Sequence, residues 1–345
     1  MHRFERSLTV PLARAELFAW HARPGAFERL APTWERMSIV ARRGTIEDGD
    51  RLHFRVHQGP LHVNWVARHC EFEAGRQFVD VAERSPFASW RHVHRFDDAP
   101  GGGSTLRDQV ELRLPLHRLS WPLAGAAVEA MLERMFRQRH LRTAIDLRRH
   151  ARVRGRAPKS LRITGTRGLL AEQLAAFWTT GGNELREAGG AEATVHIGGA
   201  SEALARACEA RSATLPAVIV IVASSTREAA AALTQVRGAG RRVVTLQTGV
   251  VVSARHPLVR GARRRLEQHV ASSGFIDLDD LVGLIHRAVF DETFEGPHDA
   301  VAAADRGERG VELDFPTLGQ SLAHQLGRLD ERALARALEA FAALD

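Results

Sequence analysis

The chain has 345 residues, of which 44% are apolar and 26% are charged, and this composition excludes a disordered, collagen-like or disulfide-rich protein. A single hydrophobic core stops growing at roughly 250 to 300 residues, so the length predicts two domains. With two cysteines, no apolar run near the roughly 20 residues of a membrane span and no apolar signal-peptide core, we expect a cytoplasmic protein without a membrane span.

Charge is distributed unevenly along the chain. Residues 1–157 carry 27 basic and 18 acidic side chains, a net charge of +9, whereas the rest carry 21 and 23, a net charge of −2. The change falls in a segment rich in Arg, Gly and Pro, so we expect domains at 1–152 and 160–345 with a linker at 153–159. The arginines of the first half are not interleaved with aromatic residues on one face, and no nucleic-acid partner is expected.

The first half predicts a strand, two short helices, a meander and a long helix. Residues 3–10 alternate between polar and apolar side chains, which is typical of a strand. Residues 13–32 form two short helical patterns broken by a Pro-Gly pair, and residues 37–115 read as antiparallel strands separated by turn clusters. Residues 124–152 carry apolar side chains every three or four positions, which predicts an amphipathic helix packed on the sheet.

One predicted hairpin places polar residues on an inner face. On the strand at residues 88–96, alternation puts Trp90, His92 and His94 on the same side, and the aromatic residues make that side the inner one. On the returning strand Asp108 stands in an otherwise apolar row. Folding the hairpin brings Asp108 opposite His92 or His94, and a buried carboxylate needs such a partner. We expect the paired histidine to have a raised pKa.

Three interpretations of this group stay open: a polar pair that anchors the hairpin, a recognition point for a ligand hydroxyl or carbonyl, and a metal site. No further ligand is evident in the sequence, so no metal site is predicted. Trp65 and Phe78 on neighbouring strands, with Met131 and Met135 on the helix, are expected to line the same pocket, and ordinary core packing explains them as well.

The element order and the hairpin segments SPFASWRHVHRF and GGGSTLRDQVELRLP resemble the SRPBCC superfamily of START-like and birch-allergen-like ligand-binding proteins, in its bacterial cyclase/dehydrase-like branch. The resemblance covers about the first 150 residues. It implies an α+β helix-grip fold, in which an antiparallel sheet and a long C-terminal helix enclose an apolar cavity. A lipophilic small molecule is the ligand that such a cavity holds.

The second half alternates between strands and helices from Ser160 onward. Strand patterns occur at residues 161–165, 194–200, 217–225 and 241–253, with helical segments between them. Repeated units of this kind predict an α/β domain with a doubly wound parallel sheet. The first strand runs into a glycine turn and a helix, the arrangement at which a pyrophosphate binds, although the pattern GxxGxxA is not specific by itself.

The segments RITGTRGLLAEQL, TVHIGGA, VVTLQTGVVVS, FIDLDDLVGLIHRAV and GPHDAVA, in this order, resemble the atypical short-chain dehydrogenase/reductase group of NAD-dependent epimerases, which occurs fused to an N-terminal SRPBCC domain. The resemblance implies a Rossmann-like NAD(P)-binding domain. It assigns the dinucleotide phosphates to Gly165, Thr166, Arg167, Gly168 and Leu169, the adenosine side to Gly198 and Gly199, and the catalytic serine to Ser224 or Ser225.

Departures from that family predict a degenerate domain. Its members use a Tyr acid beside a Lys, whereas this chain has no tyrosine and a single lysine, Lys159. Arg167 and Ala171, the latter in place of a glycine, predict weak or no binding of NAD or NADP. We therefore expect a protein that binds a lipophilic small molecule, with an inactive second domain. The alternative is an NAD(P)-dependent oxidoreductase or epimerase that uses Ser224 or Ser225 and a histidine acid.

Overall fold

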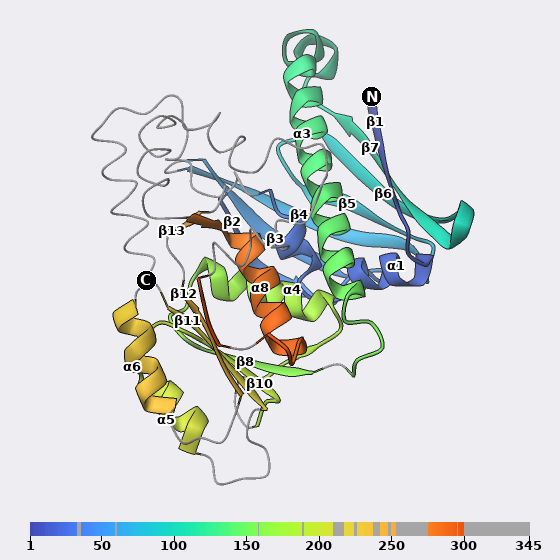
Figure 1. The fold of residues 1–345 in the computed structure, drawn as a ribbon. Helices are drawn as coiled ribbons and strands as arrows, with labels where there is room; N and C mark the ends of the chain where they lie inside the picture. Colours follow the sequence, from blue (N-terminus) through green and yellow to red (C-terminus); the bar gives the residue numbers. More distant parts are fainter. Residues whose placement is uncertain are drawn as a thin grey trace. The chain divides into compact units, whose positions relative to one another are not determined.

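Figure 1 shows the computed structural model of the chain, which describes residues 1–32, 36–58, 61–157, 159–187, 190–209, 217–223, 226–236, 242–247, 250–252, 275–294 and 296–299. The chain divides into two compact units, Met1–Ala151 and Arg152–Asp345, each with its own main sheet. Within the described residues, no helix combines the length and the apolar character that crossing a membrane requires.

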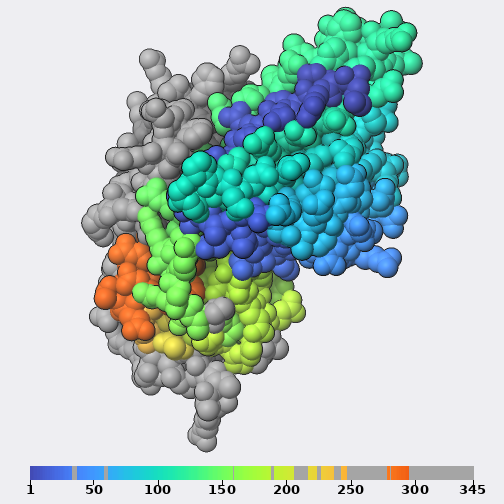
Figure 2. Space-filling view, turned by 90° about the vertical axis from the view of Figure 1, so that its right-hand side faces the viewer, coloured from blue at the N-terminus to red at the C-terminus, as the bar shows by residue number. Residues whose placement is uncertain are grey.

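The first unit is built on one antiparallel sheet of seven strands in the order β1-β7-β6-β5-β4-β3-β2. The strands are β1 (His2–Val10), β2 (Arg36–Arg43), β3 (Arg51–Gln58), β4 (Leu61–Glu73), β5 (Gln77–Arg84), β6 (Ser89–Ala99) and β7 (Gly103–Arg113). Consecutive strands pair from β2 to β7, which confirms the meander, and β1 completes the sheet beside β7. In Figure 2 the dark blue β1 runs along the surface of this unit.

One face of this sheet is buried, because polar and apolar side chains alternate along its strands. On β6 the buried side chains are Trp90, His92, His94 and Phe96. On β7 they are Ser104, Leu106, Asp108, Val110 and Leu112. The strand phase predicted from the sequence is confirmed, and the intervening Arg95 and Arg107 are exposed.

Three α-helices cover the buried face: α1 (Arg14–Ala22), α2 (Ala26–Leu30) and α3 (His117–Ala151). The predicted break between the two short helices is confirmed, and Gly25 supports it with a φ of 92°, a backbone conformation that favours glycine. Figure 1 shows α3 lying across the strands. Leu132 and Phe136 of α3 are fully buried against side chains of β6 and β7.

The start of α3 was predicted too late in the chain. The apolar spacing of the sequence indicated a start at about residue 124. Pro122 lies before that point, and a proline lacks the N–H that an interior helical residue donates. In the structure α3 begins at His117 and continues through Pro122 to Ala151. A proline so near the beginning removes a single helical hydrogen bond, and the remaining turns of this 35-residue helix stay intact.

The second unit contains a six-stranded sheet in the order β15-β12-β11-β10-β8-β9. The strands are β8 (Ser160–Gly165), β9 (Glu184–Leu185), β10 (Ala193–Ile197), β11 (Val218–Ala223), β12 (Arg242–Gln247) and β15 (Gly296–Asp299). All of their pairings are parallel. The strand order reverses between β8 and β10, which is the point where doubly wound sheets place their ligands.

Helices cover both faces of this parallel sheet. They are α4 (Leu169–Thr180), α5 (Glu202–Glu209), α6 (Thr226–Val236) and α8 (Leu278–Phe290). On β11, Val218, Val220 and Val222 pack with residues of α4 and α8. The alternate residues Ile219 and Ile221 pack with residues of α5 and α6. The strand is therefore buried on both sides, and the expected doubly wound arrangement fits the described residues.

The strand predicted at residues 241–253 is divided in the structure. Its first part is β12 in the main sheet, and its second part is β13 (Val250–Val252), which pairs with β14 (Phe275–Asp277) in a separate sheet. Both parts are rich in β-branched residues, so the sequence shows one continuous strand pattern. Residues 248–249 between them lie outside the described part of the chain.

Candidate functional site

A cavity of about 340 Å³ lies within the first unit, and α1, α2, the sheet and α3 all contribute to its lining. An antiparallel sheet with a long helix and an internal cavity fits the expected helix-grip fold. Most of the lining is apolar. The apolar residues that the strands contribute include Met37, Leu52, Phe54, Val56, Val63, Trp65, Ala67, Phe78 and Trp90.

The residues predicted to line a pocket fall mostly on this cavity. Those that line it are Trp65, Phe78, Trp90, His92, His94, Met131 and Met135. The Trp65 ring stacks on Phe54 and meets the edge of Trp90, with ring centroids 5.8 and 5.2 Å apart. These contacts hold the rings in place, so the apolar lining is largely preformed. Met131 also reaches solvent, because its side chain is 43% exposed.

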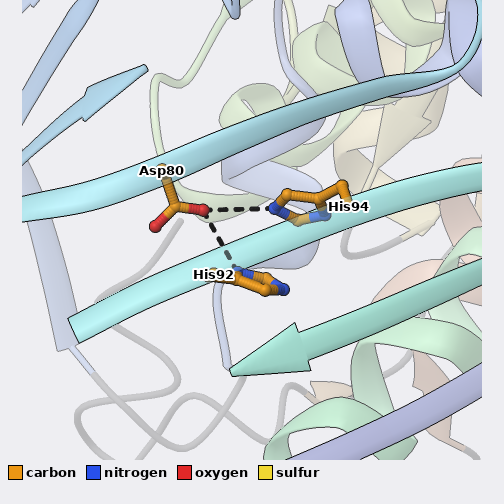
Figure 3. Close-up of side chains that lie close together, drawn as sticks. All are labelled: Asp80, His92 and His94. Carbon is orange, nitrogen blue, oxygen red and sulfur yellow. Dashed lines mark hydrogen bonds and ion pairs between the residues drawn. The ribbon is translucent and has the colours of Figure 1, made fainter. Parts of the chain in front are cut away.

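Three of the polar side chains in the lining lie together, and we call Asp80, His92 and His94 the histidine wall (Figure 3). The Oδ2 atom of Asp80 lies 3.1 Å from Nδ1 of His92 and 3.2 Å from Nε2 of His94. Asp80 stands on β5 directly opposite His92 of β6 in the strand register. Two neighbouring strands therefore bring one carboxylate to both imidazoles.

Asp108 lies behind the histidine wall and does not line the cavity, which corrects its assignment to the pocket. It stands opposite His94 in the strand register, and its side chain is 4% exposed. Its Oδ1 atom lies 2.9 Å from Nε2 of His92 and 2.9 Å from Nδ1 of His94. The two larger imidazole rings separate Asp108 from the cavity, so this carboxylate acts on a ligand only through His92 and His94.

Sequence reasoning did not find Asp80 or His140. Nε2 of His140, on α3, lies 2.6 Å from Oδ2 of Asp108, so Asp108 contacts three imidazoles. The signals were present in the sequence. Asp80 follows the cavity residue Phe78 by two positions on one strand, and His140 follows the buried Phe136 by four positions on one helix.

The charges of these groups depend on one another. Burial lowers the pKa of His92, but the carboxylates of Asp80 and Asp108 outweigh this effect and raise the pKa above its ordinary value. The predicted raised histidine pKa is confirmed at His92. Burial raises the pKa of Asp108, yet the hydrogen bonds from His140, His92 and His94 lower it well below the usual range. Both Asp80 and Asp108 are therefore ionised at neutral pH.

Further polar groups from α1, β4 and α3 reach the same cavity. They are His21, His69 and Arg139. Nδ1 of His21 lies 2.8 Å from the backbone oxygen of Leu17, and burial lowers the pKa of His21 to about 3. Burial also lowers the pKa of His69. These two imidazoles are neutral at pH 7.

In the second unit, the predicted glycine turns lie at the carboxyl ends of β8 and β10. Gly165 has a φ of 86°, and a Cβ atom there would lie 2.0 Å from the backbone oxygen of Ile197, so the close approach requires glycine. The amide of Thr166 donates to Ile197, and the amide of Gly198 donates to Val222. Two amides of the turns are thus bound within the fold.

The remaining predicted cofactor residues surround the start of α4. Arg167 precedes Gly168, which caps the helix, and Leu169 is its first residue. The backbone oxygen of Gly199 lies 2.7 Å from Nε2 of His196, so this glycine faces its own strand end. The proposed catalytic positions, Ser224 and Ser225, lie outside the described residues.

Comparisons with known proteins give one family match and several similar structures. Residues 10–140 match the family of polyketide cyclase / dehydrase and lipid transport proteins. A nucleoside-diphosphate sugar epimerase from Corynebacterium glutamicum has a similar crystal structure, with a TM-score of 0.69 and 23% identity over 98% of this chain and 93% of that chain. The Zhui aromatase/cyclase from Streptomyces sp. R1128 has a TM-score of 0.36 and 15% identity, over 45% of this chain and 99% of that chain. No curated protein matches the sequence.

These findings bear differently on the two units. The family match lies entirely within the first unit and agrees with ligand binding in a helix-grip cavity. The likeness to the epimerase establishes a shared fold that includes both parts of the chain. The parallel sheet of the second unit is consistent with a Rossmann-like domain.

Proposed function

We propose that the first unit binds a largely apolar small molecule in its cavity and that a hydrogen-bonding group of this molecule meets the histidine wall. The cavity itself carries the proposal. Its volume of about 340 Å³ lies at the small end of the range of ligand pockets, and its lining is apolar except for a few convergent polar groups. An apolar molecule gains free energy by leaving water for such a space, while the polar groups select its orientation.

Asp80 is the group that we expect to contact the ligand directly. A single oxygen, Oδ2, meets both imidazoles, and Figure 3 shows the second oxygen pointing away from both rings. A ligand hydroxyl can donate a hydrogen bond to this second oxygen. Because the acceptor is an ionised carboxylate, such a bond contributes more than one between neutral groups. The preferred ligand is therefore an apolar molecule with one or two hydroxyl groups.

Native mass spectrometry of the full-length protein tests this function. We expect the purified chain to carry an added mass that denaturation releases. A variant with Ala67→Phe, which fills the cavity from β4, should lose that mass. The matched control is Ala130→Phe on the exposed side of α3, which should keep it. Circular dichroism confirms that each variant is folded. An added mass that survives Ala67→Phe in the folded protein contradicts the proposal.

We further propose that the second unit binds NAD(P) weakly or not at all and has no reductase activity. The chain has no tyrosine to act as the acid of a short-chain reductase. Ala171 adds a Cβ atom where the related pattern has glycine, and the amides of Thr166 and Gly198 are already bound within the fold. The second unit then acts as an interaction or stability module.

A working epimerase or oxidoreductase is the alternative function, favoured by the similar structure from Corynebacterium glutamicum, which is named as a nucleoside-diphosphate sugar epimerase. Calorimetric titration of the full chain with NAD+ and with NADPH separates the two. We expect little or no heat of binding for either cofactor, and no turnover of carbonyl substrates. Tight binding of either cofactor would support the alternative.

A further inference from the structure

The histidine wall brings three metal-ligating atoms together at the cavity. They are an oxygen of Asp80, Nδ1 of His92 and Nε2 of His94, and candidate ligand atoms of this group all lie within 4.8 Å of one another. His92 and His94 come from the same face of β6, and Asp80 comes from the neighbouring strand. The backbone of two paired strands therefore holds the three side chains in a fixed arrangement.

The spacing of these atoms suits a small divalent ion. Bonds of about 2.0 to 2.2 Å from Zn²⁺ to nitrogen and oxygen, at tetrahedral angles, place neighbouring ligand atoms about 3.4 Å apart. The distances from Oδ2 of Asp80 to the two histidine nitrogens are 3.1 and 3.2 Å. Both distances are close to that spacing, and the candidate ligand atoms all lie within 4.8 Å of one another.

Asp108 and His140, behind the histidine wall, hold the imidazole rings in an orientation that suits a metal ligand. Histidines that bind a metal usually donate their other ring N–H to a carboxylate, which fixes the tautomer and the ring orientation. Here Nε2 of His92 forms this hydrogen bond with Asp108 at 2.9 Å, whereas Nδ1 of His94 lies 2.9 Å from Asp108 without the geometry of a hydrogen bond. His140 in turn holds Asp108 from α3. This arrangement points one nitrogen of each ring towards Asp80 and the other towards Asp108.

We propose that Asp80, His92 and His94 form a binding site for a divalent transition metal of the zinc class. Two imidazoles and a carboxylate are a common ligand set of catalytic zinc sites, which leave a position open for water or substrate. Since all three residues line the cavity, the open position faces the space in which the apolar ligand is proposed to bind. The proposal goes beyond ligand binding, because the ion needs no apolar molecule to be held.

Metal binding is tested on the full chain after treatment with a chelator and removal of that chelator. Calorimetric titration with ZnCl₂ should show one tight site per chain. Titration with CoCl₂ should produce the intense visible absorption of four- or five-coordinate Co²⁺, which a loosely held six-coordinate ion does not show. Neither measurement depends on the apolar ligand, so failure here is distinguishable from failure of the proposed function.

Variants locate the ion. Asp80→Asn and His94→Gln should each abolish the visible absorption and weaken Zn²⁺ binding by more than about tenfold. Asp108→Asn should weaken it by about 10- to 100-fold, since it removes the carboxylate that accepts the hydrogen bond of His92 and lies beside His94. The control is the double variant His57→Gln/His62→Gln, which removes a cross-strand histidine pair on β3 and β4 that could bind Zn²⁺ adventitiously.

The outcomes are separable even if one variant fails to fold. Circular dichroism and urea unfolding establish which variants are folded, and Asp80→Asn preserves the shape of the side chain. Loss of binding in folded Asp80→Asn, with binding kept in the His57/His62 variant, supports the site. Any of three results overturns the proposed site: Zn²⁺ binding is lost in the His57/His62 variant, it is retained in folded Asp80→Asn, or the original chain has no tight Zn²⁺ site.

Discussion

Two buried ionic groups in the first unit differ in what surrounds them. Arg29 of α2 and Asp146 of α3 form a bidentate pair at 2.7 and 2.6 Å, and both side chains are 0% exposed. Neither residue lines the cavity. The histidine wall is also buried, but its three side chains line the cavity and Asp80 is 17% exposed. One group is closed within the protein, and the other is open to a ligand.

The two groups differ in whether their charges only stabilise the fold or can also contact a ligand. The guanidinium of Arg29 matches the carboxylate of Asp146, so the pair joins α2 to α3 without facing the cavity. Behind the histidine wall, the carboxylate of Asp108 contacts three imidazoles, whereas Asp80 within the wall keeps one oxygen away from the rings. We expect substitutions in the closed pair to affect stability alone and substitutions in the open group to affect binding as well.

The largest effect is expected at the closed pair. Arg29→Met leaves the charge of Asp146 buried without its partner and should lower the free energy of unfolding by about 3 to 5 kcal/mol. The double variant Arg29→Met/Asp146→Leu should recover much of that loss, because it removes both charges. Urea unfolding followed by tryptophan fluorescence measures both, since five of the six tryptophans belong to the first unit. If Arg29→Met were as stable as the original chain, the pair would not stabilise the fold.

A smaller loss of stability is expected behind the open group. Asp108→Ala deprives His92 and His140 of a buried acceptor and should cost about 1 to 3 kcal/mol. Arg107, the neighbouring residue on β7, faces solvent, and Arg107→Ala should cost less than about 0.5 kcal/mol. The same unfolding experiment measures the two variants side by side. Equal effects at both positions would mean that burial on this strand is assigned to the wrong face.

A pH dependence of stability is expected from His21, which lies beside the histidine wall. Burial holds its folded pKa at about 3, and His94, Asp108 and Arg139 act on it from the elements packed around it. Since the unfolded chain binds the proton near pH 6.5 and the folded chain does not, His21 costs stability as the pH falls from about 6.5 towards 3. The stabilisation is complete above pH 6.5.

The variant His21→Gln should therefore lose stability more slowly than the original chain below pH 6.5. The difference between their free energies of unfolding should change by about 1 kcal/mol for each pH unit. Urea unfolding at pH 7.5, about 6 and about 5 provides the comparison. Parallel pH curves for the two proteins would show that His21 is not buried in its neutral form.

How far the sequence predicts this site depends on the range of the contacts. The alternation along β6 and β7 predicted that His92, His94 and Asp108 share the buried face, because neighbouring strands of a hairpin are joined locally. Asp80 and His140 were not found, since their contacts join β5 and α3 to the hairpin across the fold. The position of Asp108 behind the imidazole rings was not predicted either. Alternation predicts which face of the sheet a side chain occupies, but not whether that side chain reaches the cavity.

The fold was more predictable than the site. Alternation and turn clusters predicted the meander, and repeated strand-helix units predicted the parallel sheet of the second unit. The errors occurred where a local pattern competed with tertiary packing. The apolar spacing placed the start of α3 at about residue 124 instead of His117, and the continuous strand pattern at residues 241–253 did not show the division between β12 and β13.

The central claim is that an apolar cavity with one polar wall selects apolar molecules that carry a hydroxyl group. The most direct test compares the affinities of naphthalene and naphthol for the full chain, in the presence of a chelator, by the quenching of tryptophan fluorescence. A hydrogen bond to the Asp80 carboxylate should make naphthol bind about tenfold more tightly, and Asp80→Asn should remove most of this preference. Equal affinities for the two compounds, or a preference that Asp80→Asn leaves unchanged, would contradict the claim.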